Sequence, residues 1–153
     1  MVTIWQRDLQ PAHTFTVWLL AHGRLPVRAR QEYLEDRLCT FCRHDEETMD
    51  HIFFRCQTVQ QLWGRVRGWL QMRPQMATYR CMLRTFRRQY QGTSTLARAR
   101  HLAMSAMVHH IWMARNYSMF EGKRFDGELV FRKIQIHVFR TLGVLADQVL
   151  RHE

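Results

Sequence analysis

The sequence predicts a mostly α-helical protein. Apolar residues recur at three- and four-residue steps along most of the chain, which is the spacing of one face of an α-helix. The sequence shows no convincing run of alternating strand residues, no internal repeat and no low-complexity tract. The chain has 153 residues, of which 46% are hydrophobic, and this is enough to bury a core. We therefore expect a folded protein rather than a disordered one.

The N-terminal part predicts a short helix, a turn and a second helix. An apolar run over residues 13–22 predicts the first helix, and Gly23 interrupts it. Pro26 then opens residues 27–37, which we predict to be helical because proline is tolerated in the first turn of a helix. Residues 39–50 have no helical period, so a loop or small hairpin is expected there.

Two further helices are predicted in the middle of the chain. Thr48 can cap a short helical turn that carries His51. The next stretch places six apolar residues on one helical face: Val59, Leu62, Trp63, Val66, Trp69 and Leu70. Pro74 is expected to end this segment, and residues 79–90 then show a second amphipathic pattern with arginines on its polar faces.

The C-terminal half predicts a helical hairpin. Residues 91–94, which include a glycine, form the expected linker. Apolar residues then keep a helical period from 96 to 112. Asp126 can cap a last helix, whose apolar residues extend from Val130 to Val149.

Three of the four cysteines lie close to a histidine in the spacing C-x2-C-x8-H-x4-C, formed by Cys39, Cys42, His51 and Cys56. The first pair makes a tight turn that directs two thiolates at one point, and the later His and Cys close a tetrahedron. These residues predict one structural Zn²⁺ ion, with no open position for a reactive water. Four cysteines could also form two disulfides, but this clustering favours metal binding in a reducing, intracellular compartment: the nucleus, the cytoplasm or an organelle.

Other roles for these residues stay open. Cys39 and Cys42 can be buried free thiols, with His51 as a capped surface residue. His44 can replace His51 as a ligand, although its closeness to Cys42 would strain the turn. Cys81 is expected to be a buried thiol.

The ligand spacing divides the chain at residue 73. Residues 1–73 are the predicted zinc-binding domain, and residues 74–153 are a basic helical region with the C-terminal hairpin. The second region can pack against the first as one unit. The expected architecture is thus a small zinc-stapled helical domain followed by a C-terminal helical hairpin.

The positive charge of the chain is concentrated in its middle. The formal net charge is +10, yet residues 1–56 (seven bases, eight acids) and 121–153 (six bases, five acids) sum to zero. Residues 57–120 contain no acid and ten arginines: Arg65, Arg67, Arg73, Arg80, Arg84, Arg87, Arg88, Arg98, Arg100 and Arg115. Guanidinium groups form forked hydrogen bonds to phosphate and stack on bases, so this segment predicts a surface for nucleic acid.

Six of these arginines are the predicted nucleic-acid contacts. On the helix expected over residues 79–90, four of them form one continuous stripe: Arg80, Arg84, Arg87 and Arg88. Arg98 and Arg100 follow on the next helix. An ordinary solvated face is the alternative, and the aromatic residues among these arginines are expected to face the core.

Several segments resemble a known family: residues 13–19, Gly23 to Pro26, Cys39 to Cys42, Glu47 to Cys56, and Trp63. They resemble the zinc-binding domain that follows reverse transcriptase in plant retrotransposons lacking long terminal repeats. The resemblance implies Cys39, Cys42, His51 and Cys56 as ligands and Trp18, Leu25, Pro26 and Trp63 as framework residues. Residues 111–120 resemble the tail that often follows this domain, so the similarity covers roughly residues 12–70 and 100–145. The family usually has proline after its first cysteine, where this chain has Thr40.

The resemblance implies descent from a retroelement, as a domesticated or remnant stand-alone copy, and a role near RNA or DNA. The leading hypothesis is a zinc-stabilised protein that binds RNA or single-stranded DNA and has no polymerase activity. The alternative is an adaptor or inhibitor whose arginine surface and helical hairpin bind an acidic protein. We expect no enzymatic activity, because the closed zinc site and the acid-free basic surface offer no general base. We also expect no membrane association, because the longest apolar runs are far too short to span a bilayer.

Overall fold

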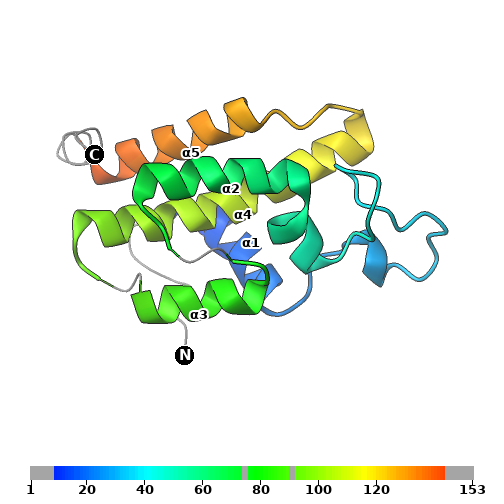
Figure 1. The fold of residues 1–153 in the computed structure, drawn as a ribbon, viewed down its shortest axis with the longest axis horizontal. Coiled ribbons are helices and arrows are strands. Elements are labelled where there is room, and N and C mark those ends of the chain that lie inside the picture. The colour runs from blue at the N-terminus through cyan, green and yellow to red at the C-terminus, as the bar shows by residue number, and fades with distance from the viewer. Residues whose placement is uncertain (1–8, 74–75, 90–91, 144–153) are drawn as a thin grey trace.

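The computed structural model describes residues 9–73, 76–89 and 92–143. Its α-helices are α1 (Pro11–Ala21), α2 (Gln57–Leu70), α3 (Tyr79–Gln89), α4 (Thr95–Glu121) and α5 (Gly127–Leu142), with short helical turns η1 (Arg28–Arg30) and η2 (His51–Arg55) (Figure 1). Within the described ranges the only β-type pairing is one isolated antiparallel bridge between Leu38 and Glu46. The predicted mostly α class is confirmed.

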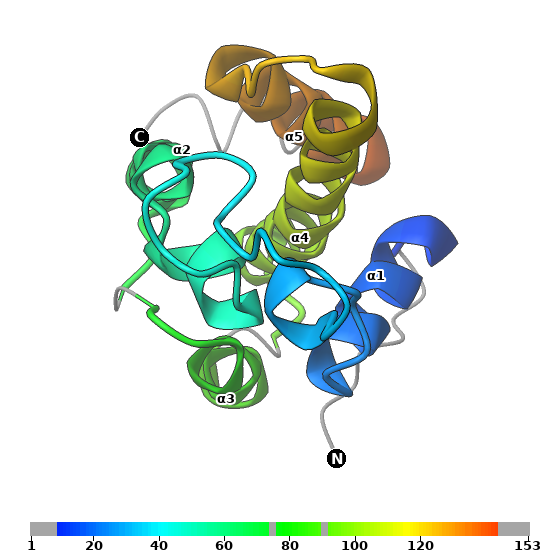
Figure 2. The same cartoon turned by 90° about the vertical axis from the view of Figure 1, so that its right-hand side faces the viewer.

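Helix α4 is the centre of the fold. It packs against α1, α2, α5 and η2, and Figure 2 shows it surrounded by the other helices. A helix that is apolar on most of its circumference belongs in the interior of a protein. Accordingly, eight of its consecutive residues are buried: His101, Leu102, Ala103, Met104, Ser105, Ala106, Met107 and Val108.

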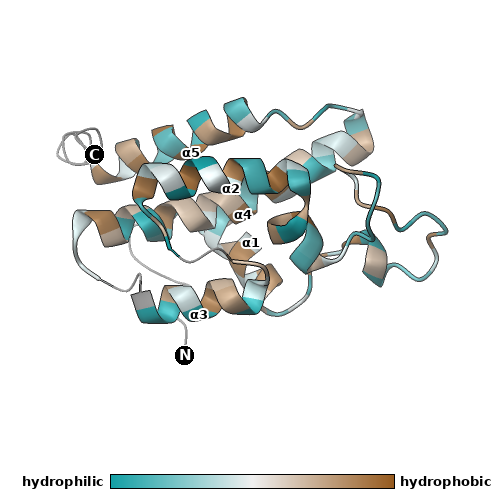
Figure 3. Ribbon diagram, in the orientation of Figure 1, coloured by the Kyte–Doolittle hydropathy of each residue, from teal (hydrophilic) through white to brown (hydrophobic). Residues whose placement is uncertain are grey.

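Helices α4 and α5 form the predicted hairpin. Ser94 caps α4 by accepting a hydrogen bond from the Ala97 N–H, 3.1 Å long. The helix ends at Glu121, and the next residue, Gly122, has a φ of +67°, the left-handed conformation that favours glycine. Asp126 then caps α5 through the Leu129 N–H at 3.1 Å, as predicted. In Figure 3, polar and apolar residues alternate along α5, as expected for a helix with one buried face.

Helix α2 and the turn η2 complete the core beside α4. Trp63 is buried and donates its indole N–H to the carbonyl of Phe53 at 2.6 Å. Phe53 stacks on Trp112 of α4, with ring centroids 6.1 Å apart. Trp63 therefore has the framework role that the resemblance implied, and it joins α2 to the turn that precedes it.

One predicted helix is wrong. Residues 27–37 form only the three-residue turn η1 instead of a full helix. The Arg28 N–H donates to the Glu47 carboxylate at 3.0 Å, and the Ala29 N–H donates to the Glu47 carbonyl at 3.1 Å. Further along, the Gln31 and Leu34 N–H groups donate to carbonyls three residues earlier, at 3.1 and 3.0 Å, so the segment forms separate turns that pack against a distant loop.

Several predicted boundaries also differ. Helix α4 continues to Glu121, well beyond the apolar pattern that ended at residue 112. Helix α2 ends at Leu70, before Pro74, and the next residue adopts a φ of +52°. Pro74, Tyr90 and the predicted continuation of α5 to Val149 lie outside the described residues. None of the described helices combines the length and apolar character needed to cross a membrane.

A buried histidine in α4 makes folding sensitive to acid. His101 is 3% exposed, packs on the Phe86 ring at 4.5 Å between centroids, and burial lowers its pKa to about 4. The unfolded chain has the ordinary His pKa of about 6.5, so the unfolded state binds the proton first as the pH falls. The stabilising contribution is therefore complete above pH ~6.5 and is lost as the pH falls toward ~4.

We expect His101→Leu to remove this part of the pH dependence. The wild type should lose about 2 kcal/mol of unfolding free energy more than the variant between pH 7 and pH 5. Urea unfolding at the two pH values measures the difference, with His22→Leu on the exposed end of α1 as the control. Equal pH dependence in wild type and His101→Leu would contradict the assignment.

Candidate metal centre

The first two cysteines are presented by one tight turn. The Cys39 N–H donates to the Asp45 carbonyl at 2.7 Å, and the Arg43 N–H donates back to the Cys39 carbonyl at 3.0 Å. Arg43 has a φ of +59°, a left-handed conformation that is uncommon outside glycine and that closes the turn after Cys42. The small hairpin expected over this segment is thus a turn with a single bridge above it.

The other two ligands flank η2, which has π-helical hydrogen bonding: His51 is its first residue, and Cys56 directly follows its last. Its characteristic bond joins the Cys56 N–H to the His51 carbonyl, five residues earlier, at 2.7 Å. This wide turn brings two residues five positions apart to the same side of the chain. Single π-helical turns are rare and occur frequently at functional sites. Thr48 accepts a hydrogen bond from the His51 N–H at 3.0 Å, so the predicted cap is confirmed.

The four predicted ligands converge. Their ligand atoms all lie within 4.8 Å of one another. Cys39 Sγ lies 3.9 Å from Cys56 Sγ, and Cys42 Sγ lies 3.4 Å from His51 Nε2. Tetrahedral zinc with ordinary Zn–S and Zn–N bonds places its ligand atoms roughly 3.5–3.8 Å apart. The geometry fits one structural zinc ion, and His44 is exposed and does not belong to the set.

Burial and charge favour a closed site. Cys39 and Cys56 are fully buried, and His51 is 8% exposed. The hydrogen bond from the Cys39 thiol lowers the pKa of Cys56 to about 5, while the same bond raises the pKa of Cys39. A bound zinc ion deprotonates coordinating thiols, and all four protein ligands would then fill its coordination. Asp45 Oδ2 lies 3.9 Å from His51 Nδ1, which is beyond hydrogen-bond distance.

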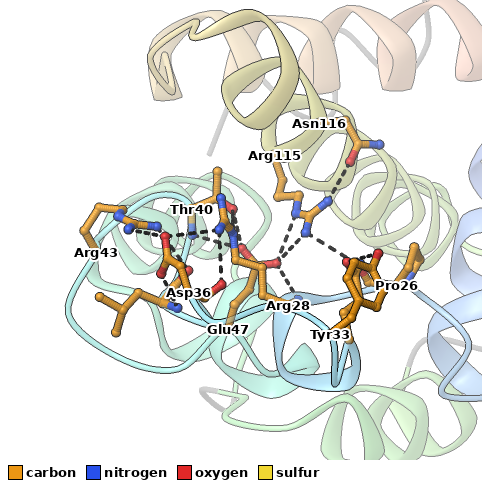
Figure 4. Close-up of polar contacts among 11 residues, drawn as sticks. Pro26, Arg28, Tyr33, Asp36, Thr40, Arg43, Glu47, Arg115 and Asn116 are labelled. Carbon is orange, nitrogen blue, oxygen red and sulfur yellow. Dashed lines mark hydrogen bonds and ion pairs between the residues drawn. The ribbon is translucent and has the colours of Figure 1, made fainter.

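Beside the site lies a buried ion pair that the sequence did not predict (Figure 4). Glu47 and Arg115 are 0% and 2% exposed, and the guanidinium donates from Nη2 at 2.7 Å and from Nε at 3.1 Å. The carboxylate also accepts from the backbone N–H of Arg28 and of Thr40. Burial alone would raise the pKa of Glu47, but the hydrogen bonds from Arg115 and Thr40 outweigh it and lower the pKa.

This ion pair corrects the prediction that all ten arginines of residues 57–120 contribute to a basic surface. Arg115 was counted among the ten arginines of a basic surface, but it is buried and neutralised by Glu47. The sequence does contain a signal, because Arg115 lies in an apolar stretch whose neighbours include no acid. A partner for such an arginine has to come from a distant part of the chain.

Thr40 departs from the usual proline of the resembled family for a visible reason. Its backbone N–H donates to Glu47 at 2.9 Å, and its hydroxyl donates to the same carboxylate oxygen. Proline has neither group. The residue after the first cysteine thus belongs to the hydrogen-bond set of the buried carboxylate.

The predicted arginine stripe is present on α3. Arg80, Arg84, Arg87 and Arg88 are all exposed, and the last three line an open hollow of about 450 Å³ together with Leu83. The remaining two predicted contacts differ. Arg98 is half-buried, and Arg100 donates to the carbonyls of Leu70 and Gln71, both at 2.9 Å. These last two hydrogen bonds hold α4 to the end of α2.

Fold and site together define a mostly helical protein with one Cys₃His zinc centre. Residues 1–63 match the family described as zinc-binding in reverse transcriptase, and all four ligands lie within the matched segment. The resemblance is confirmed for this part of the chain, and the domain of that family is a zinc-binding accessory domain rather than a catalytic one. The match does not extend to residues 100–145, where the resemblance stays a prediction. Searches of curated proteins and of solved structures found no significant match.

Proposed function

We propose that this protein is a zinc-stabilised, sequence-nonspecific binder of RNA or single-stranded DNA, derived from a retroelement and without polymerase activity. The observation that carries the proposal is the exposed arginine stripe on α3, formed by Arg80, Arg84, Arg87 and Arg88. Among the residues that the structure describes, the lining of the hollow that three of them share includes no acidic side chain. Four guanidinium groups on one helix can follow a phosphate backbone and donate forked hydrogen bonds to it.

Residues next to the zinc ligands hold the start of α3 in place. Asp50, next to the ligand His51, accepts the N–H of Tyr79 at the start of α3 at 2.9 Å. Arg55 of η2 donates to the carbonyl of Ala77 at 3.1 Å. The metal therefore has a structural role: it fixes the turn η2, and residues of this turn and beside it hold the start of α3. We propose no catalytic role, because four protein ligands leave zinc no position for an activated water.

We expect replacement of Arg80, Arg84, Arg87 and Arg88 by glutamine to abolish most binding to a fluorescent single-stranded RNA. If all four contact phosphates, the log–log slope of affinity against salt should become less steep by about 3. The measurement is a fluorescence anisotropy titration of zinc-loaded protein at several salt concentrations.

The matched control replaces four exposed arginines elsewhere by glutamine: Arg30, Arg124, Arg132 and Arg140. It lowers the net charge by the same amount, so it separates a local contact from a general charge effect. Binding that is insensitive to salt, or equally weakened in both variants, would refute the α3 surface. Circular dichroism at the same concentrations confirms that both variants are folded.

A second candidate function is an adaptor or inhibitor that binds an acidic protein. A groove of about 110 Å³ between α4 and α5 favours it. Its apolar part is formed by Met113, Ala114, Leu129 and Val130, and beside them lie three basic residues, Lys123, Arg124 and Lys133, and the acidic Asp126. A partner that survives nuclease treatment in a pull-down would support this function. Co-purifying nucleic acid would instead raise the ratio of nucleic-acid to protein absorbance in the ultraviolet at low salt. At high salt the nucleic acid would dissociate, and this ratio would fall.

A further inference from the structure

Four histidines gather where α1, α4 and α5 meet. His13 comes from α1, His109 and His110 come from α4, and His137 comes from α5. The ring centroid of His13 lies 4.6 Å from those of His109 and His137, and 5.4 Å from that of His110. These residues are separate from the Cys₃His centre and take no part in the proposed nucleic-acid surface.

Two of these rings hold buried nitrogen atoms that have no hydrogen-bond partner within the described part of the chain. They are His13 Nδ1 and His137 Nε2, and the whole His13 side chain is only 3% exposed. Leaving a buried polar atom without a partner costs about 1–3 kcal/mol. In a cluster of histidines, such nitrogen atoms indicate a site where their lone pairs would bind a metal ion.

The distances between the ring centroids are close to those around a shared metal ion, but the ring nitrogen atoms do not yet converge. With metal–nitrogen bonds of about 2.1 Å, two imidazoles on a tetrahedral ion have centroids about 5 Å apart. Among the described residues, only the Cys₃His set already has its ligand atoms all within 4.8 Å. Binding at the histidines therefore requires the rings to rotate, and the torsion that turns an imidazole has a broad energy profile.

The protonation state also suits a metal. Burial, followed by the neighbouring imidazoles, lowers the pKa of His13 to about 3, and burial lowers the pKa of His110 to about 4. Neutral imidazole is the form that binds metals. Thr16 Oγ1 lies 3.0 Å from His109 Nδ1, and because the Thr16 hydroxyl donates to the Ala12 carbonyl, Nδ1 is the donor and Nε2 keeps the lone pair that binds a metal. The positive charge of Lys133 also lowers the pKa of His110.

We propose that His13, His109 and His137 bind a second divalent transition-metal ion of the zinc class, with His110 or water completing its coordination. Imidazole ligands suit Zn²⁺, Co²⁺ and Ni²⁺. The ion would join α1, which lies in the segment matched to the zinc-binding family, to both helices of the C-terminal hairpin.

The test is a Co²⁺ titration of the protein already loaded with one zinc ion per chain. In wild type we expect one further ion per chain by native mass spectrometry. It should give visible d–d absorption without the ultraviolet band of cobalt–thiolate bonds. The double variant His109→Gln/His137→Gln should bind Co²⁺ at least tenfold more weakly, and the control His22→Gln should bind like wild type.

A second measurement keeps the test decisive if the double variant folds poorly. Co²⁺ in excess should raise the thermal midpoint of the zinc-loaded wild type, and the single variant His137→Gln, at a half-buried position, should lose this shift. The proposal is overturned if wild type takes up no second ion, or if the double variant binds it as tightly. Appearance of the thiolate band with one ion in total would also overturn it, because cobalt would then only have replaced zinc.

Discussion

Replacing Arg115 with methionine is expected to lower the free energy of unfolding by about 3–5 kcal/mol, which is the usual cost of breaking a buried ion pair from one side. The variant keeps the Glu47 carboxylate fully buried but removes the guanidinium that donates two hydrogen bonds to it. Arg115 also lies over the Trp112 ring, 4.7 Å from its centroid, and this contact is lost as well. Urea unfolding of the zinc-loaded protein at neutral pH measures the change.

Two further variants separate the buried charge from lost packing. The double variant Glu47→Gln/Arg115→Met removes the unpaired charge, so it should recover part of the loss. Arg132→Met breaks an exposed pair with Glu128, whose side chains are 70% and 55% exposed, and should cost less than about 1 kcal/mol. If Arg115→Met is no worse than Arg132→Met, the buried pair contributes little and the assignment is wrong.

Replacing Cys42 with serine is expected to release the Cys₃His zinc ion and to loosen the fold around residues 25–70. Structural zinc sites contribute apparent binding free energies of about 10–16 kcal/mol, and a missing thiolate removes a large share of this. Residues Ile52 to Phe54 are buried in the core and lie between two of the remaining ligands, so the loss should spread beyond the site. Hydrogen exchange of backbone amides, with zinc content measured in parallel, follows both effects.

Cys81→Ser is the matched control for the zinc prediction. Cys81 is half-buried on α3 and lies outside the ligand set, so this variant should keep its zinc and its amide protection. Removing zinc from wild type with a chelator should reproduce the Cys42→Ser exchange pattern. Equal damage from the two cysteine variants would count against the ligand assignment.

Features that depend on neighbours in sequence were predictable. The spacing of Cys39, Cys42, His51 and Cys56 specified the zinc set, because a turn and a short helical segment bring these positions together. The caps formed by Thr48 and Asp126 were predictable too, since each acts on an N–H only three residues away. Helix existence followed from apolar periodicity, and this is the strongest local signal.

Features that depend on distant contacts were missed. Glu47 and Arg115 are 68 positions apart, so nothing local indicated that one was the partner of the other. The contact of residues 27–37 with Glu47, which accepts the Arg28 N–H from outside the segment, was missed for the same reason. The role of Arg100 was also missed, since its partners are carbonyls at the end of another helix.

The contact between Asp50 and the first turn of α3 has a consequence for how the protein responds to zinc supply. An isolated helix of 11 residues is marginal in water, and its first N–H groups have no partner within the helix. Tyr79 obtains its partner from Asp50, 29 positions earlier, and Asp50 is held beside the ligand His51. Thr78 caps the same turn locally by accepting the Cys81 N–H at 3.0 Å, so Asp50 supplies one of two hydrogen bonds there. Release of the zinc ion should therefore loosen the first turn of α3, and zinc supply would then regulate how well the arginine stripe binds.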